Sequence, residues 1–318
     1  MNAFYKIFVL GGKGLYLKWH KKPLHINLEI SLACNARCPF CNYWKNKPQN
    51  ATSESLFEFL KKMNPVLMTI SGGEPLMRED ICEYVQKIKK AVPHSYVSLI
   101  SNGSLLSLEK AKSLCESGVS QLCLSLDYLS DFHDKARKLP GVFQKIQELM
   151  PRLVTFPFDR VTLNTIIMDS NLDHLVPLAL KAHEWGAHIN FSSYYFGKNG
   201  NTWGHVKSKN IEKLKQVATE LKKIKKKLRH ISTGDYFFDH VVSYFQGNEI
   251  PHCEAGLKWI QVSPEGYVKR CSEMPALYHH TEFYNKYQFE PTDCTACWFS
   301  CRAEIQAPMK LDRIRDLV

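Results

Sequence analysis

The stretch Cys34-Asn35-Ala36-Arg37-Cys38-Pro39-Phe40-Cys41 carries three cysteines in the spacing C-x3-C-x2-C. It follows an alternating apolar run from His25 to Leu32. Soft thiolates this close together suit an iron–sulfur cluster or zinc better than a disulfide framework. Three thiolates hold three irons of a cubane cluster and leave the fourth iron open to an external ligand. The other interpretation is a zinc site that a distant histidine completes.

With the aromatic Phe40 before its last cysteine, this loop resembles the signature of the radical S-adenosylmethionine (radical SAM) superfamily. The resemblance implies that Cys34, Cys38 and Cys41 bind a [4Fe–4S] cluster whose open iron is chelated by S-adenosylmethionine. In that superfamily, one-electron reduction of the cofactor yields methionine and a 5′-deoxyadenosyl radical, which abstracts a hydrogen atom from the substrate. A reducing protein such as flavodoxin or ferredoxin is the partner that this chemistry implies.

Composition narrows the class of protein. The chain has 318 residues and 44% hydrophobic content, which fits one large domain with a small appendage. Its eleven cysteines are clustered, which favours metal-bound thiolates in a reducing, cytoplasmic compartment over a disulfide scaffold. Charges interrupt every apolar run, so no membrane-spanning segment is expected.

The net charge of +11 comes largely from residues 207–229. A basic surface favours acidic partners such as phosphates, anionic lipid or nucleic acid, although a solvated helix face has the same composition. No DNA-binding role is expected.

Six short apolar segments predict β-strands, and helical patterns lie between them. The strands are expected at His25–Leu32, Val66–Ser71, Tyr96–Ser101, Gln121–Leu126, Arg160–Ile167 and His188–Ser193. The helices are expected at Ser53–Met63, Glu79–Ala91, Ser107–Ser117, Val142–Leu149 and Leu172–Trp185. This alternation predicts an α/β fold with a parallel sheet, and the resemblance implies a partial (β/α)6 TIM-type barrel. Parallel barrels place their chemistry on the loops at the C-terminal ends of the strands.

Four regions are expected along the chain. Residues 1–24 form a leader, 25–205 the barrel, 206–250 a helical connector and 251–318 a small cysteine-rich domain. The connector contains an amphipathic helix from Lys207 to Arg229. The leader is aromatic and basic, so it either caps the barrel or lies on an anionic membrane surface as a peripheral segment.

Several loops at predicted strand ends resemble cofactor-binding motifs of the superfamily. Ser71-Gly72-Gly73-Glu74-Pro75 follows the second strand and resembles its Gly-Gly-Glu-Pro motif, which contacts the methionyl amino group of the cofactor. Further resemblances lie at the ends of the next three strands and in the stretch that contains Arg137, which would pair with the carboxylate of the cofactor. The residues implied to bind S-adenosylmethionine are Phe40, Gly72, Gly73, Glu74, Asn102, Ser125, Asp127, Arg137 and Asn164.

A second group of cysteines lies near the C-terminus, as Cys253-x12-Gly266-x4-Cys271 followed by Cys294-x2-Cys297-x3-Cys301. Zinc ribbons use similar spacings. The pattern also resembles the SPASM and shorter twitch extensions of radical SAM relatives, which carry auxiliary [4Fe–4S] clusters. Five cysteines support one such cluster, so two clusters are expected in all. Its implied ligands are Cys253, Cys271, Cys294 and Cys297, with Cys301 either spare or replacing Cys297.

A β-hairpin is expected between the two halves of this second group, from Trp259–Val262 and Tyr267–Lys269. It would form part of a twitch-like C-terminal domain.

The leading hypothesis is a radical SAM enzyme that abstracts hydrogen from an unidentified small molecule or lipid. The outcome would be an oxidation or a bond-forming step in biosynthesis. The alternatives are modification of a peptide or an RNA by the same chemistry, or a zinc-binding protein associated with nucleic acid. No catalytic acid or base can be assigned from the sequence.

Overall fold

Six parallel strands form most of a nine-stranded sheet in the computed structural model, which describes residues 11–17, 19–20, 22–46, 54–282 and 292–308. The strands run in the order β6-β5-β4-β3-β2-β1, and each pairs in parallel with the next. Their bounds are β1 (His25–Ser31), β2 (Leu67–Gly72), β3 (Tyr96–Ser101), β4 (Gln121–Ser125), β5 (Arg160–Ile167) and β6 (His188–Ser193). The predicted strands are confirmed, to within one residue at each end.

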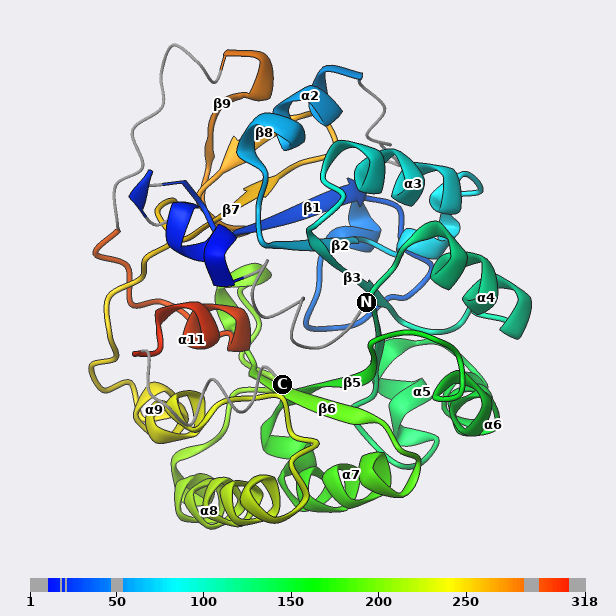
Figure 1. Ribbon diagram of the computed structural model, residues 1–318. Coiled ribbons are helices and arrows are strands. Elements are labelled where there is room, and N and C mark those ends of the chain that lie inside the picture. Colours follow the sequence, from blue (N-terminus) through cyan, green and yellow to red (C-terminus); the bar gives the residue numbers. More distant parts are fainter. Residues whose placement is uncertain (1–10, 18, 21, 47–53, 283–291, 309–318) are drawn as a thin grey trace.

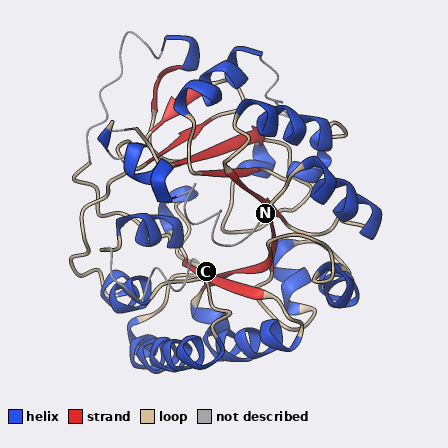
Figure 2. Cartoon of the chain, viewed as in Figure 1, coloured by secondary structure: helices blue, strands red, loops and turns tan. Residues whose placement is uncertain are grey.

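Helices cover the outer face of this sheet (Figures 1 and 2). They are α2 (Glu54–Met63), α3 (Ile81–Ala91), α4 (Leu108–Ser117), α5 (Phe132–Arg137), α6 (Val142–Leu153), α7 (Leu172–Glu184), α8 (Ile211–Leu228) and α9 (Asp235–Phe245). A further helix, α11 (Ser300–Gln306), lies at the open side of the barrel and lines the cavity. Short 3₁₀ helices are η1 (Tyr43–Lys45), η2 (Pro75–Met77), η3 (Asp169–Asn171), η4 (Phe196–Lys198), η5 (Ser208–Asn210) and η6 (His280–Glu282). The predicted helices are all present, whereas α5, α9 and α11 were not anticipated.

Local signals explain where the helices begin and end. The Ser107 hydroxyl accepts a hydrogen bond from the backbone N–H of Lys110 (3.1 Å) and so caps α4, as expected of an N-cap residue. Gly118 ends the same helix in the left-handed conformation at φ 107°. Ser53, where the sequence predicts the start of the first helix, lies outside the described residues.

Strand β1 shows that one face of the sheet packs in the hydrophobic core and the other lines a cavity. Ile26, Leu28 and Ile30 are fully buried in the main hydrophobic core. Because side chains alternate along a strand, His25 and Asn27 point to the opposite face, where they line a cavity. The inner face of this sheet is therefore partly polar.

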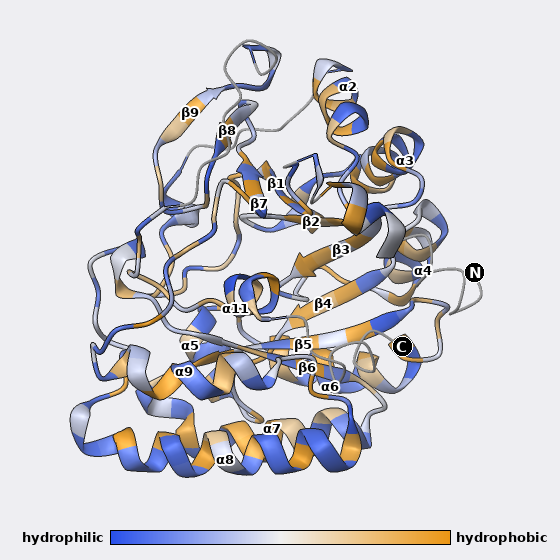
Figure 3. Cartoon of the chain, turned by 60° about the vertical axis from the view of Figure 1, so that its left-hand side comes forward, coloured by the Kyte–Doolittle hydropathy of each residue, from blue (hydrophilic) through white to orange (hydrophobic). Residues whose placement is uncertain are grey.

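The connector helix α8 packs on α7 and α9. Its apolar residues recur at three- and four-residue steps, and Leu214, Leu221 and Ile224 are buried. Figure 3 shows hydrophobic and hydrophilic residues alternating along this helix. The excess of lysines therefore belongs in large part to the outer face of an amphipathic helix.

The C-terminal region continues the barrel sheet. Strand β7 (Trp259–Val262) pairs in parallel with β1, and β8 (Tyr267–Lys269) and β9 (Ala276–His279) follow in antiparallel pairing. The predicted hairpin is thus confirmed, but it adds to the same sheet rather than forming one of its own. The described sheet stays open between β6 and β9, and α11 packs on β6 and α9 at this side (Figure 1). The predicted partial barrel is confirmed.

The described part of the leader contacts the body of the protein. Leu17 is buried, and the Lys13 amine donates to the Ser95 hydroxyl (3.1 Å). Leu15, Tyr16 and Trp19 are exposed. Among the described residues, no helix has the length and apolar character that a membrane-spanning segment requires.

The glycine pair after β2 lies directly against the cysteine loop after β1. The Gly73 N–H donates to the Ser31 carbonyl (2.8 Å), and the Glu74 N–H donates to the Ala33 carbonyl (2.7 Å). A Cβ atom at Gly73 would lie 2.0 Å from the Ala33 carbonyl oxygen. Only glycine allows the two loops to approach this closely.

We therefore expect Gly73→Ala to destabilise the protein by roughly 1–3 kcal/mol, the range for overpacking a well-filled site. Urea-induced unfolding followed by circular dichroism measures the loss. Gly12→Ala is the matched control, because a Cβ there meets no atom within 4 Å. Equal stability of the two variants would contradict the close approach of the loops.

Candidate active site

The first three cysteines lie in the loop between β1 and η1, and all are free thiols. Burial raises the pKa of Cys38 to about 12 and that of Cys34 to about 11. A smaller contribution to the raised pKa of Cys38 comes from Cys34 and Cys41, so the three sulfurs are electrostatically coupled. Without metal, Cys34 and Cys38 are protonated near neutral pH. A cluster that binds them as thiolates would release these protons.

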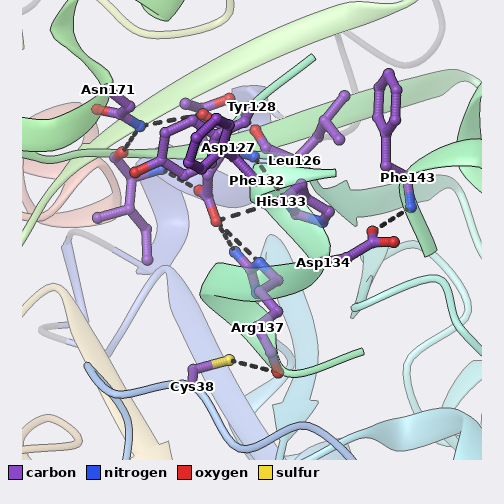
Figure 4. Close-up of polar contacts among 12 residues, drawn as sticks. Cys38, Leu126, Asp127, Tyr128, Phe132, His133, Asp134, Arg137, Phe143 and Asn171 are labelled. Atoms are coloured by element: carbon purple, nitrogen blue, oxygen red, sulfur yellow. Dashed lines mark hydrogen bonds and ion pairs between the residues drawn. The ribbon is translucent and has the colours of Figure 1, made fainter. Parts of the chain in front are cut away.

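The end of α5 holds the cysteine loop in place. The Arg137 carbonyl accepts a hydrogen bond from the Arg37 N–H (3.1 Å). The Cys38 thiol lies 3.9 Å from the same carbonyl (Figure 4). The position of the middle cysteine therefore depends on a helix that follows β4, almost one hundred residues further along the chain.

The Glu74 carboxylate joins the second and third strand ends. It is fully buried and accepts hydrogen bonds from the Ser101 hydroxyl (2.7 Å) and from the backbone N–H groups of Asn102 (2.7 Å) and Leu76 (3.1 Å). Burial raises the pKa of Glu74, and these three donors oppose the rise. The carboxylate thus organises the protein itself. Its predicted contact with the cofactor's amino group stays a prediction.

Asn102 ties the third strand end to the cysteine loop. Its amide nitrogen donates to the Asn35 side-chain oxygen (2.9 Å), and the Asn35 amide donates to the Ser104 hydroxyl (2.8 Å). The Ser104 hydroxyl in turn donates to the Asn102 side-chain oxygen (2.6 Å). This closed ring of three polar side chains fixes the start of the cysteine loop.

Asp127 and Arg137 form a buried ion pair behind the loop (Figure 4). The guanidinium donates from Nε (2.9 Å) and Nη2 (2.8 Å) to the same carboxylate oxygen, Oδ2. The other oxygen accepts the Ile166 N–H (3.0 Å). The Asp127 N–H donates to His133 Nδ1 (3.1 Å). Asp127 and Arg137 therefore bind each other in this structure, and their predicted contacts with the cofactor stay predictions.

The ring of Phe40 is held on two sides. The Arg137 guanidinium lies 5.6 Å from its centroid, and the Trp203 ring stacks against it with centroids 6.5 Å apart. The Asn201 amide also donates to the Pro39 carbonyl (3.0 Å). The segment after β6 therefore packs on the cysteine loop and positions the residue before Cys41.

A cavity of about 730 Å³ lies inside the open barrel. Three predicted cofactor contacts, Ser125, Arg137 and Asn164, line one part of it. All five C-terminal cysteines line another part: Cys253, Cys271, Cys294, Cys297 and Cys301. Its volume lies within the range of small-molecule sites, about 300–1,000 Å³. The C-terminal cysteines thus face the same cavity as three of the predicted cofactor contacts.

Arg302 organises the second cysteine region. Its side chain is 1% exposed, and Nη2 donates to the Cys294 carbonyl (3.3 Å) and to the Pro251 carbonyl. Nη1 donates to the Cys297 carbonyl and lies 3.9 Å from the Cys297 sulfur. The Cys253 N–H also donates to the Cys294 carbonyl (3.0 Å). One guanidinium therefore joins the backbone at Pro251 to the backbone of the Cys294–Cys297 stretch.

The donor set at both regions fits iron–sulfur clusters. Each region offers several free thiols that sense one another electrostatically. Burial raises the pKa of Cys297 to about 12. Among the residues that the structure describes, no three His, Cys, Asp or Glu side chains are arranged to hold a single metal ion. Thiolates are the ligands of [4Fe–4S] clusters, so the chemistry of the donors is appropriate.

The predicted site residues fall into two groups. Ser125, Arg137 and Asn164 line the cavity. The remaining predicted contacts pack around or behind the cysteine loop, and none of them is among the residues lining the cavity: Phe40, Gly72, Gly73, Glu74, Asn102 and Asp127. Their roles toward the cofactor stay predictions.

The polar lining of the barrel interior was not predicted from the sequence. Parallel strands that are buried on both faces read as nearly continuous apolar runs. The alternation of His25, Asn27 and Glu29 in β1 departs from that pattern and was the available signal. Arg302 carried no such signal, because only the fold reveals what surrounds it.

These features define a class of proteins: partial parallel barrels with a thiolate-bound cofactor at the C-terminal ends of the strands. Residues 28–182 match the model of the Radical SAM superfamily, and the chain belongs to this superfamily. It is a radical SAM enzyme.

Similar proteins include GTP 3',8-cyclase from Clostridium perfringens (strain SM101 / Type A), which is 24% identical over 80% of this chain and 82% of its own length. AdoMet-dependent heme synthase from Methanosarcina barkeri (strain Fusaro / DSM 804) is 30% identical over 52% of this chain and 48% of its own length. The crystal structure of Streptococcus suis SuiB bound to S-adenosylmethionine superposes with a TM-score of 0.66 at 15% identity, covering 86% of this chain and 69% of SuiB. The structural likeness supports the fold.

We expect Asp127→Asn to lower the free energy of unfolding by about 3–5 kcal/mol, because removing one partner of a buried pair leaves an uncompensated charge. Asp131→Asn is the matched control. Asp131 pairs with Lys135 (2.7 Å) on the surface, and exposed pairs contribute only about 0–1 kcal/mol. Urea unfolding of both variants measures the difference. A loss for Asp127→Asn no larger than for the control would show that the pair does not hold the loop.

Proposed function

We propose that this enzyme uses S-adenosylmethionine and two [4Fe–4S] clusters to abstract a hydrogen atom from a small organic substrate. The step would be an oxidation or a bond formation in biosynthesis. The observation that carries the proposal is the cavity that Ser125, Asn164 and the C-terminal cysteines line together. A substrate held there would lie between the radical source and a second redox centre.

The chemistry comes from the bound groups. When bound, S-adenosylmethionine and the first cluster would supply a radical for hydrogen abstraction, and an auxiliary cluster would supply an acceptor for the electron that the substrate radical gives up with a proton. The protein orients the substrate and excludes water. A reducing protein such as flavodoxin or ferredoxin would deliver the electron that starts the reaction.

The cofactor would bind beside the cysteine loop. Cys34, Cys38 and Cys41 would hold the first cluster. The residues proposed to contact S-adenosylmethionine are those on the cysteine loop and on the four strand ends that surround it: Phe40, Gly72, Gly73, Glu74, Asn102, Ser125, Asp127, Arg137 and Asn164. Their mutual hydrogen bonds support a rigid, preformed site.

The auxiliary cluster would be held by Cys253, Cys271, Cys294 and Cys297. Arg302 lies against Cys297, and burial raises the pKa of that thiol to about 12. Cys301 is exposed and lines the same cavity. We assign it as the spare thiol.

The names of the relatives mark the range of substrates. GTP is named for one relative, heme for another, and the precursor peptide SuiA is bound in a structure of SuiB. Peptide or RNA modification and a zinc-binding role remain the alternatives, but the volume of the cavity, about 730 Å³, favours a small molecule. Peripheral membrane contact through Leu15, Tyr16 and Trp19 remains a prediction.

Iron content tests the two-cluster proposal. We expect about eight irons per chain after anaerobic reconstitution, and about four in a variant carrying Cys34→Ala, Cys38→Ala and Cys41→Ala, because each [4Fe–4S] cluster holds four irons. EPR spectroscopy of the reduced proteins identifies the cluster type. The triple variant is also expected to lose cleavage of S-adenosylmethionine, measured as 5′-deoxyadenosine.

A variant carrying Cys82→Ala and Cys115→Ala is the control, because these half-buried cysteines lie on α3 and α4, outside the cavity. It should keep all of its iron. Complete loss of iron from the triple variant, with zinc remaining, would exclude the auxiliary cluster while leaving the radical SAM core intact.

Single substitutions test the ligand assignment. Cys297→Ser is expected to remove about four irons, since one ligand of a four-thiolate cluster is lost. Cys301→Ser is expected to retain all of them. The reverse result would make Cys301 the fourth ligand.

A further inference from the structure

Arg302 is a buried cation whose hydrogen-bond partners among the described residues are neutral. Its side chain is 1% exposed. The partners that the structure gives it are the carbonyls of Pro251, Cys294 and Cys297 and the side-chain oxygen of Gln306 (3.0 Å from Nε). A buried charge without a counter-charge costs several kcal/mol. A negative charge close to this guanidinium would therefore stabilise the folded protein.

The nearest candidates for that charge are the cysteine sulfurs. The Cys297 sulfur lies 3.9 Å from Nη1. Thiolates bound to a cluster would supply the missing charge.

The guanidinium is also held rigidly in place. It lies 5.4 Å from the centroid of the Trp298 ring, which is itself fully buried and donates through its indole N–H to the Phe237 carbonyl (2.9 Å). Gln306 fixes Nε and donates to the His252 carbonyl (2.5 Å). A fixed positive charge interacts with a cluster more strongly than a mobile surface lysine, because water screens the latter.

We propose that Arg302 is the counter-charge of the auxiliary cluster and raises its reduction potential, an inference that rests on the proposed second cluster. Potentials of iron–sulfur clusters depend on the net charge and on hydrogen bonds to the sulfurs, and Arg302 supplies a charge and a donor near Cys297. A higher potential makes the cluster a better electron acceptor. This direction fits a cluster that takes an electron from a substrate radical.

The contact between Arg302 and the Cys297 sulfur also distinguishes Cys297 from Cys301 as a candidate ligand. Only Cys297 is described in contact with the Arg302 guanidinium through its sulfur. The backbone carbonyls of Cys294 and Cys297 are fixed by the same side chain. Arg302 is therefore a positioning residue for two of the four proposed ligands as well as a source of charge.

The test is an EPR-monitored redox titration of the reconstituted full-length enzyme and its variants. Arg302→Gln removes the charge and keeps hydrogen-bond donors, and Arg302→Lys keeps the charge. We expect the auxiliary signal of Arg302→Gln to titrate at a more negative potential than in the wild type, with Arg302→Lys between the two. The potential of the first cluster should not move in either variant.

Lys258→Gln is the control, because Lys258 is a cation of the same region that pairs with Glu254 (2.6 Å). It should leave both potentials unchanged. An unchanged auxiliary potential in a fully loaded Arg302→Gln would overturn the inference and leave the second cluster in place. Failure of both Arg302 variants to load, while the wild type loads, would reduce Arg302 to a structural role. A wild type with about four irons would refute the second cluster itself.

Discussion

The buried ion pair between Asp127 and Arg137 is the interaction on which the first site depends. Helix α5, which carries Arg137, has six residues, and a helix this short is not stable by itself. The ion pair fixes it behind the sheet, where its last carbonyl meets the cysteine loop and its guanidinium meets Phe40. A buried charge pair thus sets the position of the loop whose cysteines are proposed to hold the first cluster.

The strands and the first cysteine loop were predictable because local patterns determine them. Alternation in β1 and the spacing of Cys34, Cys38 and Cys41 are properties of neighbouring residues. The roles of Glu74 and Arg137 were not, because their partners come from other strand ends. Helix α11 was missed since it is short and its burial depends on the open side of the barrel. A sequence pattern shows the periodicity of a helix or strand. The contacts of a single side chain depend on how the strands are arranged in the fold.

One cavity connects the C-terminal cysteines with the strand ends that carry Ser125 and Asn164. The polar inner face of the barrel, with Asn27 donating to Gln261 (2.9 Å) and Ser71 donating to Asn27 (2.7 Å), is a pre-bonded lining. Such a lining costs little reorganisation when a ligand enters.

The pairing of β7 with β1 joins residues 234 positions apart in sequence, as the contact of Asn27 with Gln261 shows. Chains emerge from the ribosome from the N-terminus, and domains tend to fold as they emerge. One edge of β1 therefore stays unpaired until most of the chain has been made. An open strand edge is a template for wrong pairing, so nascent barrels have a long interval of exposure to aggregation. Iron and sulfide can reach the first cysteine loop before β7 pairs with β1. The strand topology therefore allows the first cluster to bind before the sheet is complete.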